Sequence, residues 1–337
     1  MREARLYDRL EGDRIACRVC AHRCTITPGK RGVCGVRENR DGTLYSLTYG
    51  LLISQAVDPI EKKPLFHFYP GSDAFSIASV GCNLRCSFCQ NWEISQMPRD
   101  EGRIAGHEVP AEAVVAAARR YGCRSIAYTY TEPTISFEYA YDVSVRAREA
   151  GLANVFVTNG YMTADLLQAY YPYLDAANVD LKAFRDEFYR RLCGARLAPV
   201  LDALKLMRQQ GVWLEVTTLV IPGHNDDPGE LAELAGFIAR ELGPGTPWHV
   251  SRFHPAYRLT DAPPTPAATL RRAYDIGREA GLHYVYIGNL PGLRGEDTLC
   301  PHCGQTVIAR YGFTVLERHI QNGACTHCGA AIAGVGM

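Results

Sequence analysis

The sequence has no excess of charge of either sign, because 36 lysine and arginine residues balance 36 aspartate and glutamate residues. A chain without a basic field has no general attraction for nucleic acid or for an anionic membrane surface. Long apolar runs are also missing, and none reaches the roughly 20 residues that a membrane-spanning helix needs. We therefore expect no membrane association and no main role in nucleic-acid binding.

The first residues lack the apolar core of a secretion signal. Met1 to Asp13 is rich in charged side chains, whereas a signal peptide carries an apolar stretch of about 7–15 residues. The chain nevertheless contains 13 cysteines. Cysteines without a secretion signal favour metal sites in a reducing compartment over disulfides. The expectation is a cytoplasmic metalloprotein.

These cysteines fall into three groups and two isolated residues. The groups are Cys17, Cys20, Cys24 and Cys34; Cys82, Cys86 and Cys89; and Cys300, Cys303, Cys325 and Cys328. The isolated Cys123 and Cys193 are expected to be small buried apolar residues rather than ligands.

The central group follows directly after the apolar run 74–80. Thiolates are soft ligands that select zinc or iron–sulfur clusters. A structural zinc site needs four protein ligands, and no further cysteine or histidine stands near Cys82, Cys86 and Cys89 to complete one. Three thiolates can instead hold three irons of a four-iron cluster and leave the fourth iron open to a ligand that reacts.

The two outer groups predict further metal sites. The amino-terminal group lies in a module expected over residues 1–72 and suits zinc or a second iron–sulfur cluster, since both accept four thiolates. The carboxy-terminal group reads CPxCG and CxxCG in a module over 296–337, with a possible hairpin at 307–316 between the knuckles. This pattern is typical of a zinc ribbon, and an auxiliary iron–sulfur cluster is the alternative.

Residues 73–295 alternate between strand and helix patterns. Strands are expected at 74–80, 125–130, 154–158, 177–181, 212–220, 248–253 and 284–287, and helices at 111–121, 135–150, 164–170, 200–210, 231–242 and 270–280. Repeated β-α units imply a parallel sheet covered by helices, here a full or partial (β/α) barrel of the α/β class. The charged segment Asp58 to Leu65, which prolines bracket, is expected to be a solvated loop.

In barrels of this kind the chemistry is found where strands end. Polar residues at expected strand ends are Glu132, Thr158, Asn159, Asp180, Lys182 and His254. Asp180 and Lys182 alternate with apolar neighbours, so their side chains should lie on the same side. We expect this set to converge on one cavity.

The CxxxCxxC loop and these strand ends resemble the radical S-adenosylmethionine (SAM) enzymes related to the pyruvate formate-lyase activating enzyme. Within them the chain is most similar to the radical SAM member of the AmmeMemoRadiSam system. The resemblance implies a [4Fe–4S] cluster on Cys82, Cys86 and Cys89, with SAM on the fourth iron. The family's Gly-Gly-Glu segment, which holds the SAM amino group, is here Tyr130-Thr131-Glu132, so only Glu132 carries over.

The resemblance also implies the chemistry and the partners. A reduced cluster would cleave SAM to methionine and a 5′-deoxyadenosyl radical, which takes hydrogen from a substrate that the sequence does not identify. Lys182 would pair with the methionyl carboxylate, and Asp180 and His254 match SAM-contacting positions. An electron donor such as ferredoxin or flavodoxin is expected, and Memo-like and AMMECR-type proteins are possible partners. The alternatives are an activase that installs a glycyl radical on a partner protein, and a metal-stapled module that binds protein or nucleic acid.

Overall fold

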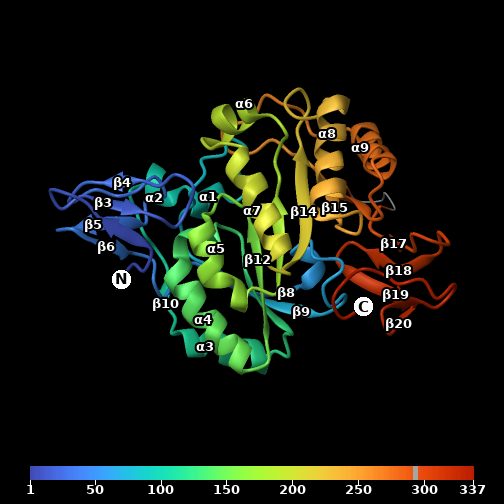
Figure 1. The fold of residues 1–337 in the computed structure, drawn as a ribbon, viewed down its shortest axis with the longest axis horizontal. Helices are drawn as coiled ribbons and strands as arrows, with labels where there is room; N and C mark the ends of the chain where they lie inside the picture. Colours follow the sequence, from blue (N-terminus) through green and yellow to red (C-terminus); the bar gives the residue numbers. More distant parts are fainter. Residues whose placement is uncertain (291–294) are drawn as a thin grey trace.

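The computed structural model describes residues 1–290 and 295–337, and its centre is an eight-stranded sheet in the order β16-β15-β14-β13-β12-β11-β9-β8 (Figure 1). Seven of these strands run parallel, and β8 pairs antiparallel with β9. The strands are β8 Ser54–Pro59, β9 Asp73–Ala78, β11 Ser125–Tyr128, β12 Ala153–Thr158, β13 Ala176–Asp180, β14 Trp213–Val220, β15 Trp248–Arg252 and β16 Val285–Gly288. In the described part of the chain β8 and β16 remain unpaired edges, so the predicted barrel is a partial one.

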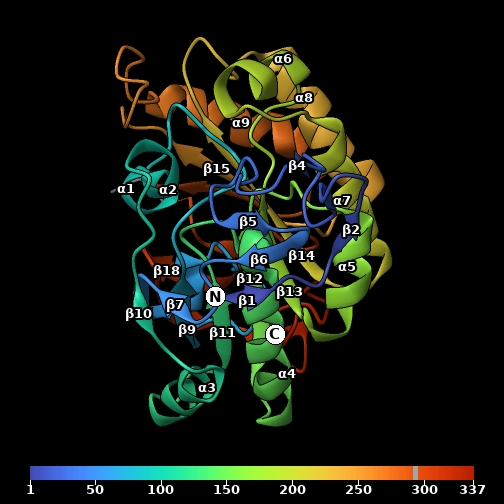
Figure 2. The same cartoon turned by 90° about the vertical axis from the view of Figure 1, so that its left-hand side faces the viewer.

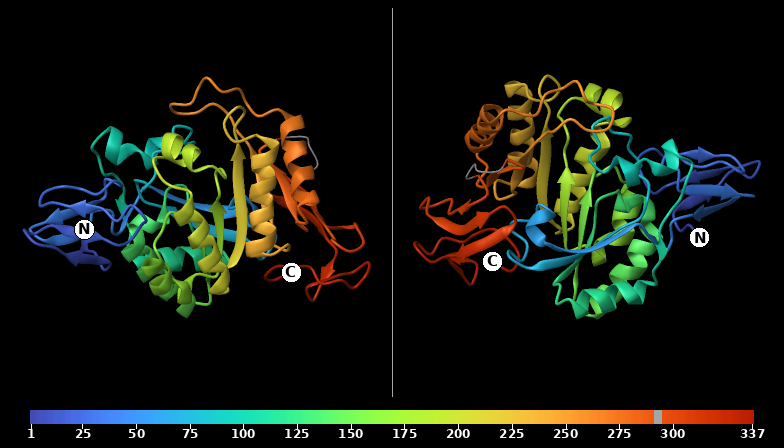
Figure 3. Two further views of the ribbon diagram at one scale, coloured as in Figure 1. Left: turned by 45° about the horizontal axis from the view of Figure 1, so that its top comes forward. Right: turned by 180° about the vertical axis from the view of Figure 1, so that it is seen from behind.

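Helices cover the outer face of this sheet (Figure 3). The longer ones are α3 Ala111–Arg120, α4 Phe137–Glu149, α5 Ala164–Tyr170, α7 Ala198–Gln209, α8 Pro228–Phe237 and α9 Ala267–Glu279; the short ones are α1 Trp92–Ser95, α2 Met97–Asp100 and α6 Asp186–Phe188. Short 3-10 segments are η1 Ile60–Lys62, η2 Pro133–Ser136 and η3 Tyr171–Tyr173, and π segments are η4 Tyr189–Cys193 and η5 Ile238–Leu242. All six predicted helices are confirmed. Within the described residues, no helix is long and apolar enough to cross a membrane.

Local chemistry explains where two of these helices differ from the prediction. The helix expected from Ile135 begins as the 3-10 segment η2, because the Glu132 carboxylate accepts from the backbone N–H of Thr134 and holds the first turn tight. The helix expected through Leu242 ends as α8 at Phe237 and continues as the π segment η5. The Thr163 side chain caps α5, since its hydroxyl accepts from Leu166 N at 3.2 Å.

The amino-terminal residues form small sheets at one end of the molecule (Figure 1), and this end faces the viewer in Figure 2. Their strands are β1 Arg2–Glu3, β5 Arg37–Arg40 and β6 Thr43–Ser46; β2 Tyr7–Arg9, β3 Ile15–Cys17 and β4 Thr25–Ile26; and the pair β7 Leu51–Leu52 with β10 His107–Glu108. A buried ion pair fixes the sheet of β1, β6 and β5 to α4, with Arg37 Nη2 at 2.6 Å from Glu138 Oε1. Breaking such a buried pair typically costs several kcal/mol, so it anchors this sheet firmly.

The carboxy-terminal residues form small sheets at the opposite end (Figure 1). Their strands are β17 Thr298–Leu299, β18 Thr306–Tyr311, β19 Thr314–Arg318, β20 Ile320–Gln321 and β21 Ala324–Cys325. The hairpin predicted at 307–316 is confirmed, because β18 and β19 pair antiparallel. The predicted module boundary at residue 295 directly follows residues 291–294, which lie outside the described part.

The solvated loop predicted for Asp58 to Leu65 is wrong. Asp58 belongs to β8, and Asp58 and Lys63 are buried, with only 5% and 1% of their surface exposed. The segment folds across the lower end of the partial barrel, where Asn178 Nδ2 donates to the carbonyl of Pro64 at 2.7 Å and Phe66 N donates to Glu215 at 3.0 Å. Residues 60–68, which we call the floor segment, therefore close the barrel at the ends of the strands where β9 begins.

Candidate active site

The loop after β9 carries the three central cysteines at the carboxyl end of the parallel sheet. Cys86 is buried, and Cys82 and Cys89 are half-buried. Donors point at two of the sulfurs: Leu84 N lies 3.4 Å from Cys82 Sγ, and the Ser95 hydroxyl lies 3.2 Å from Cys89 Sγ. Donors directed at sulfur favour the thiolate, which is the form that binds metal, but burial outweighs them and raises the pKa of both Cys82 and Cys89.

The π segment η4 supports the other side of this loop. The loop amides of Arg85 and Ser87 donate to the carbonyls of Cys193 and Leu192, both at 2.9 Å. These bonds place Cys193 opposite Cys86, and a hydrogen bond from the Cys193 thiol lowers the pKa of Cys86 below its usual range despite burial. Cys193 is fully buried and Cys123 is 5% exposed, as predicted, but the contact between Cys193 and the loop was not anticipated.

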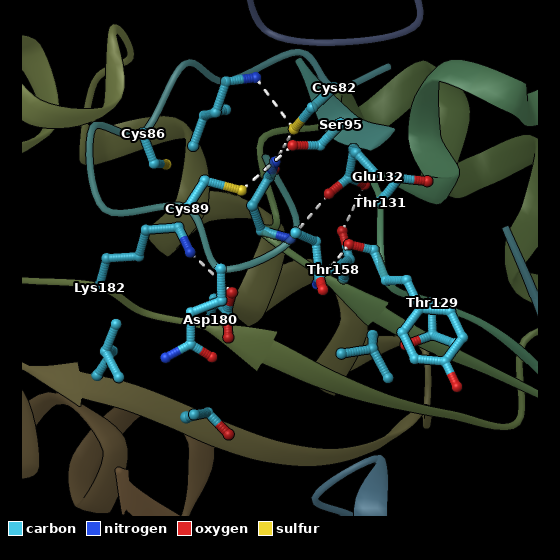
Figure 4. A pocket seen from close by; sticks show the side chains of 18 of the residues that line it. Cys82, Cys86, Cys89, Ser95, Thr129, Thr131, Glu132, Thr158, Asp180 and Lys182 are labelled. Atoms are coloured by element: carbon cyan, nitrogen blue, oxygen red, sulfur yellow. Dashed lines mark hydrogen bonds and ion pairs between the residues drawn. The ribbon is translucent and has the colours of Figure 1, made fainter. Parts of the chain in front are cut away.

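A cavity of about 310 Å³ opens beneath the loop (Figure 4). It contains most of the predicted site: Cys82, Cys86, Cys89, Glu132, Thr158, Asn159, Asp180 and Lys182 all line it. The structure therefore brings together residues from four parallel strand ends. His254 is the exception, because its side chain is exposed and does not line the cavity, so the described structure gives its predicted SAM contact no support.

Glu132 is occupied by protein donors. Its Oε1 accepts from Thr134 N at 3.1 Å and from the Thr158 hydroxyl at 2.7 Å, and its Oε2 accepts from Asn159 N at 2.9 Å. Burial raises the pKa of Glu132 against these hydrogen bonds, which lower it. The carboxylate thus orders the ends of β11 and β12, and less of its accepting capacity is left for a ligand ammonium than the resemblance implies.

Asp180 and Lys182 form an ion pair on the cavity wall. Lys182 Nζ lies 2.7 Å from Asp180 Oδ2, with 13% of the lysine side chain exposed. Burial alone would lower the pKa of Lys182, but the neighbouring Asp180 carboxylate and the Cys86 and Cys193 sulfurs raise it well above its usual value. Lys182 is therefore a permanent cation beside the cysteine loop.

Replacing Lys182 by alanine is expected to weaken SAM binding roughly tenfold to a hundredfold, since a charge-assisted contact to a carboxylate is worth about 1.5–3 kcal/mol. SAM affinity and thermal melting, measured on the same anaerobic sample, separate this role from a purely internal ion pair. Lys205→Ala is the matched control, because Lys205 also pairs with an aspartate, Asp202, but on the outer helix α7. Unchanged SAM affinity in Lys182→Ala would remove Lys182 from the site.

Sequence reasoning did not anticipate Lys62 and Lys63 in the cavity, whereas Tyr130, which also lines it, was expected at a strand end near the cavity mouth. The lysines follow β8 in the segment predicted as a loop, and Tyr130 adopts φ +64°, a left-handed backbone that a tyrosine rarely takes. The one local signal was that Tyr130 stands where the family has a glycine, the residue that adopts positive φ without strain.

The two outer cysteine groups differ in geometry. The four carboxy-terminal sulfurs lie within 4.8 Å of one another, with Cys300 and Cys328 at 3.7 Å and Cys303 and Cys325 at 3.9 Å. Tetrahedral bonds of about 2.3 Å to one ion would space sulfurs about 3.8 Å apart.

The amino-terminal thiols are less closely gathered. Cys17, Cys20 and Cys34 are buried and Cys24 is half-buried, but within the described residues no three of them approach this closely. His22 connects this module to the cysteine loop, with Nε2 at 2.8 Å from the carbonyl of Asn83.

Comparison with known proteins agrees with this geometry. The profile of the radical SAM superfamily matches residues 76–235, which span β9 to α8 and include the cysteine loop. The chain therefore contains a radical SAM domain and is an enzyme that uses SAM.

Individual relatives extend the comparison. An uncharacterized protein of Methanocaldococcus jannaschii is 49% identical over 334 residues, 98% of this chain and 99% of its own length. The pyruvate formate-lyase-activating enzyme of Clostridium pasteurianum is 25% identical over 164 residues, 47% of this chain and 66% of that protein. A radical SAM methyltransferase from Sphaerobacter thermophilus has the same fold, with a TM-score of 0.52, 18% identity and 71% of each chain covered.

Proposed function

We propose that Cys82, Cys86 and Cys89 hold a [4Fe–4S] cluster with which the enzyme cleaves SAM reductively to methionine and a 5′-deoxyadenosyl radical, and that this radical abstracts hydrogen from a substrate. The observation that carries the proposal is the loop of three thiols, with donors on its sulfurs, above a cavity at the carboxyl ends of parallel strands. The bound cluster supplies the electron, and the chain's own residues position the reactants.

The side chains divide these tasks. Lys182, held by Asp180, presents an ammonium for the methionyl carboxylate of SAM. Glu132 fixes Thr158 and Asn159, and Asn159 Nδ2 in turn lies 3.7 Å from Cys82 Sγ. Buried apolar residues around the loop, including Leu84 and Phe88, keep water from the reacting atoms.

The proposal predicts that anaerobically reconstituted, dithionite-reduced enzyme releases 5′-deoxyadenosine and methionine in equal amounts. Both products are measured by liquid chromatography with mass spectrometry, and enzyme without reductant is the control. A preparation that contains the cluster and binds SAM, yet releases neither product, would contradict the proposal.

A second candidate is an activase that installs a glycyl radical on a partner protein. The similarity to the pyruvate formate-lyase-activating enzyme supports it, although the alignment covers about half of this chain. A glycyl-radical signal in the EPR spectrum of an added partner would favour this candidate. The radical SAM match argues against the third alternative, in which the chain mainly serves as a metal-stabilised module that binds protein or nucleic acid.

We further propose zinc in the carboxy-terminal module, residues 296–337, since the sulfur spacing fits a single tetrahedral ion. For the module over residues 1–72 we propose a second metal site, either zinc or an iron–sulfur cluster. Membership of the AmmeMemoRadiSam system, with Memo-like and AMMECR-type partners and a ferredoxin or flavodoxin as electron donor, remains a proposal that rests on the sequence resemblance.

A further inference from the structure

We propose that the lower part of the cavity binds an anionic group of the substrate, a carboxylate or a phosphate, through Lys62 and Lys63. This inference deepens the proposed function and rests on it, because it names the class of molecule that meets the adenosyl radical. Both lysines line the same cavity as the cysteine loop. Neither is needed to explain how the cluster or SAM is held.

The two lysines enter the cavity from the end opposite to the cysteines. β8 runs antiparallel to β9, and its last residue, Pro59, pairs with Asp73 at the start of β9. The cysteine loop follows the other end of β9. The six residues of β9 make five steps of roughly 3.3 Å, which separate the two ends by about 17 Å. SAM bound beside Cys82 would thus occupy the upper part, and the lysines face the space below it.

The charges around the lysines do not balance. Asp58 is shared, with Oδ1 at 2.7 Å from Lys62 Nζ and Oδ2 at 2.7 Å from Lys63 Nζ. The Tyr130 hydroxyl donates to the same carboxylate. Two ammonium groups and one carboxylate leave one positive charge in excess. Lys63 is buried and paired with Asp58, whereas the Lys62 side chain is 43% exposed, so its ammonium is accessible to an anion that enters the cavity.

The shortage of negative charge is clearest at Lys63. Its side chain is 1% exposed, and burial lowers its pKa to about 8, with a further contribution from the like charge of Lys62, although Asp58 opposes the shift. The Tyr130 ring covers the ammonium, with its centroid 4.5 Å from Nζ. Tyr130 is held in its strained φ +64° backbone while Asn91 Nδ2 donates to its carbonyl at 2.9 Å. Strain of this kind collects at binding sites, where the surrounding structure enforces it.

The wall near SAM has no such excess. Asp180 and Lys182 neutralise each other, and Glu132 is satisfied by protein donors. The hydroxyls of Thr217 and Ser251 also line the cavity and supply neutral hydrogen-bonding groups. A substrate with one anionic end, held at Lys62 and Lys63, would direct its remaining atoms upward toward the cysteine loop.

The test measures binding of [³²P]phosphate and [¹⁴C]succinate to the reconstituted, SAM-bound holoenzyme by equilibrium dialysis. We expect wild type to bind at least one of the two anions, and Lys62→Gln to bind it at least tenfold more weakly. Binding should weaken above about pH 8, where Lys63 loses its proton. Lys205→Gln is the matched control.

The preferred anion distinguishes a phosphorylated substrate from a carboxylic acid. The inference is overturned if neither anion binds wild type, or if Lys62→Gln binds anions as well as Lys205→Gln does. It is equally overturned if Lys62→Gln loses SAM affinity in parallel, since the lysine would then belong to the SAM site. Failure of wild type to bind or cleave SAM is a separate result, and it would refute the proposed function itself.

Discussion

Replacing Cys82, Cys86 and Cys89 together by alanine is expected to remove the cluster and to reduce SAM cleavage to background. The three thiolates are the ligands that the loop offers, and soft thiolates are what iron–sulfur clusters require. Cys193 remains opposite the altered loop, but one thiolate does not replace three. Iron content, the brown absorbance of reconstituted protein and the EPR spectrum with and without SAM measure the effect.

Cys123→Ala is the matched control for this loss. Cys123 is buried at 5% exposure between α3 and β11, and it does not line the cavity. This variant should keep its iron, its absorbance and its SAM cleavage. An unchanged SAM-responsive EPR signal in the triple variant would show that the cluster is bound elsewhere and would contradict its assignment to Cys82, Cys86 and Cys89.

Replacing Cys303 by alanine is expected to remove zinc and to destabilise the protein by about 4 kcal/mol or more, a size that loss of a structural metal can reach. Cys300 and Cys325 are buried in one apolar cluster with Phe66 and Tyr286, so a loosened knuckle also disturbs the barrel floor. The thermal melting temperature and the zinc content per chain measure the effect. SAM cleavage per folded molecule should change little.

His302→Ala tests whether this effect belongs to the metal. His302 neighbours Cys303 in the same knuckle and is exposed, and it is not among the four gathered ligands. It should retain zinc and its melting temperature. Iron without zinc in the carboxy-terminal sites of the anaerobic wild-type protein would show that the metal assignment is wrong.

Periodic patterns made most of the fold predictable. The parallel strands are short apolar runs, such as the wholly buried β11, and α3 buries Val114, Val115 and Ala118 along one face. Most of the cavity could also be predicted, because strand ends in a parallel sheet meet at one edge. Asp180 and Lys182 needed only alternation along β13 to be placed together.

The floor segment could not be predicted because its partners are remote in sequence. Asp58 is buried beside Tyr130, and Phe66 and His67 donate to Glu215. A charged segment that contains prolines is predicted to be a solvated loop when its distant partners are unknown. The contact between Cys193 and Cys86 could not be predicted either, because 107 positions separate the two residues and no spacing pattern relates them. His254 also follows a strand end, but it is exposed and does not line the cavity, which its position along the strand could not reveal.

Arg310 joins the carboxy-terminal module, residues 296–337, to the floor segment, and this contact affects which parts of the chain can be lost in evolution. Its buried guanidinium lies 3.5 Å from the Glu61 carboxylate and donates to the carbonyl of Phe66 at 2.7 Å. A lineage that lost the last forty or so residues would leave Glu61 buried without its cation, a change that selection should reject unless the floor segment changed as well. The carboxy-terminal module and the floor segment are therefore expected to be inherited or lost together, and the Methanocaldococcus relative, which aligns over 98% of this chain, has kept both regions.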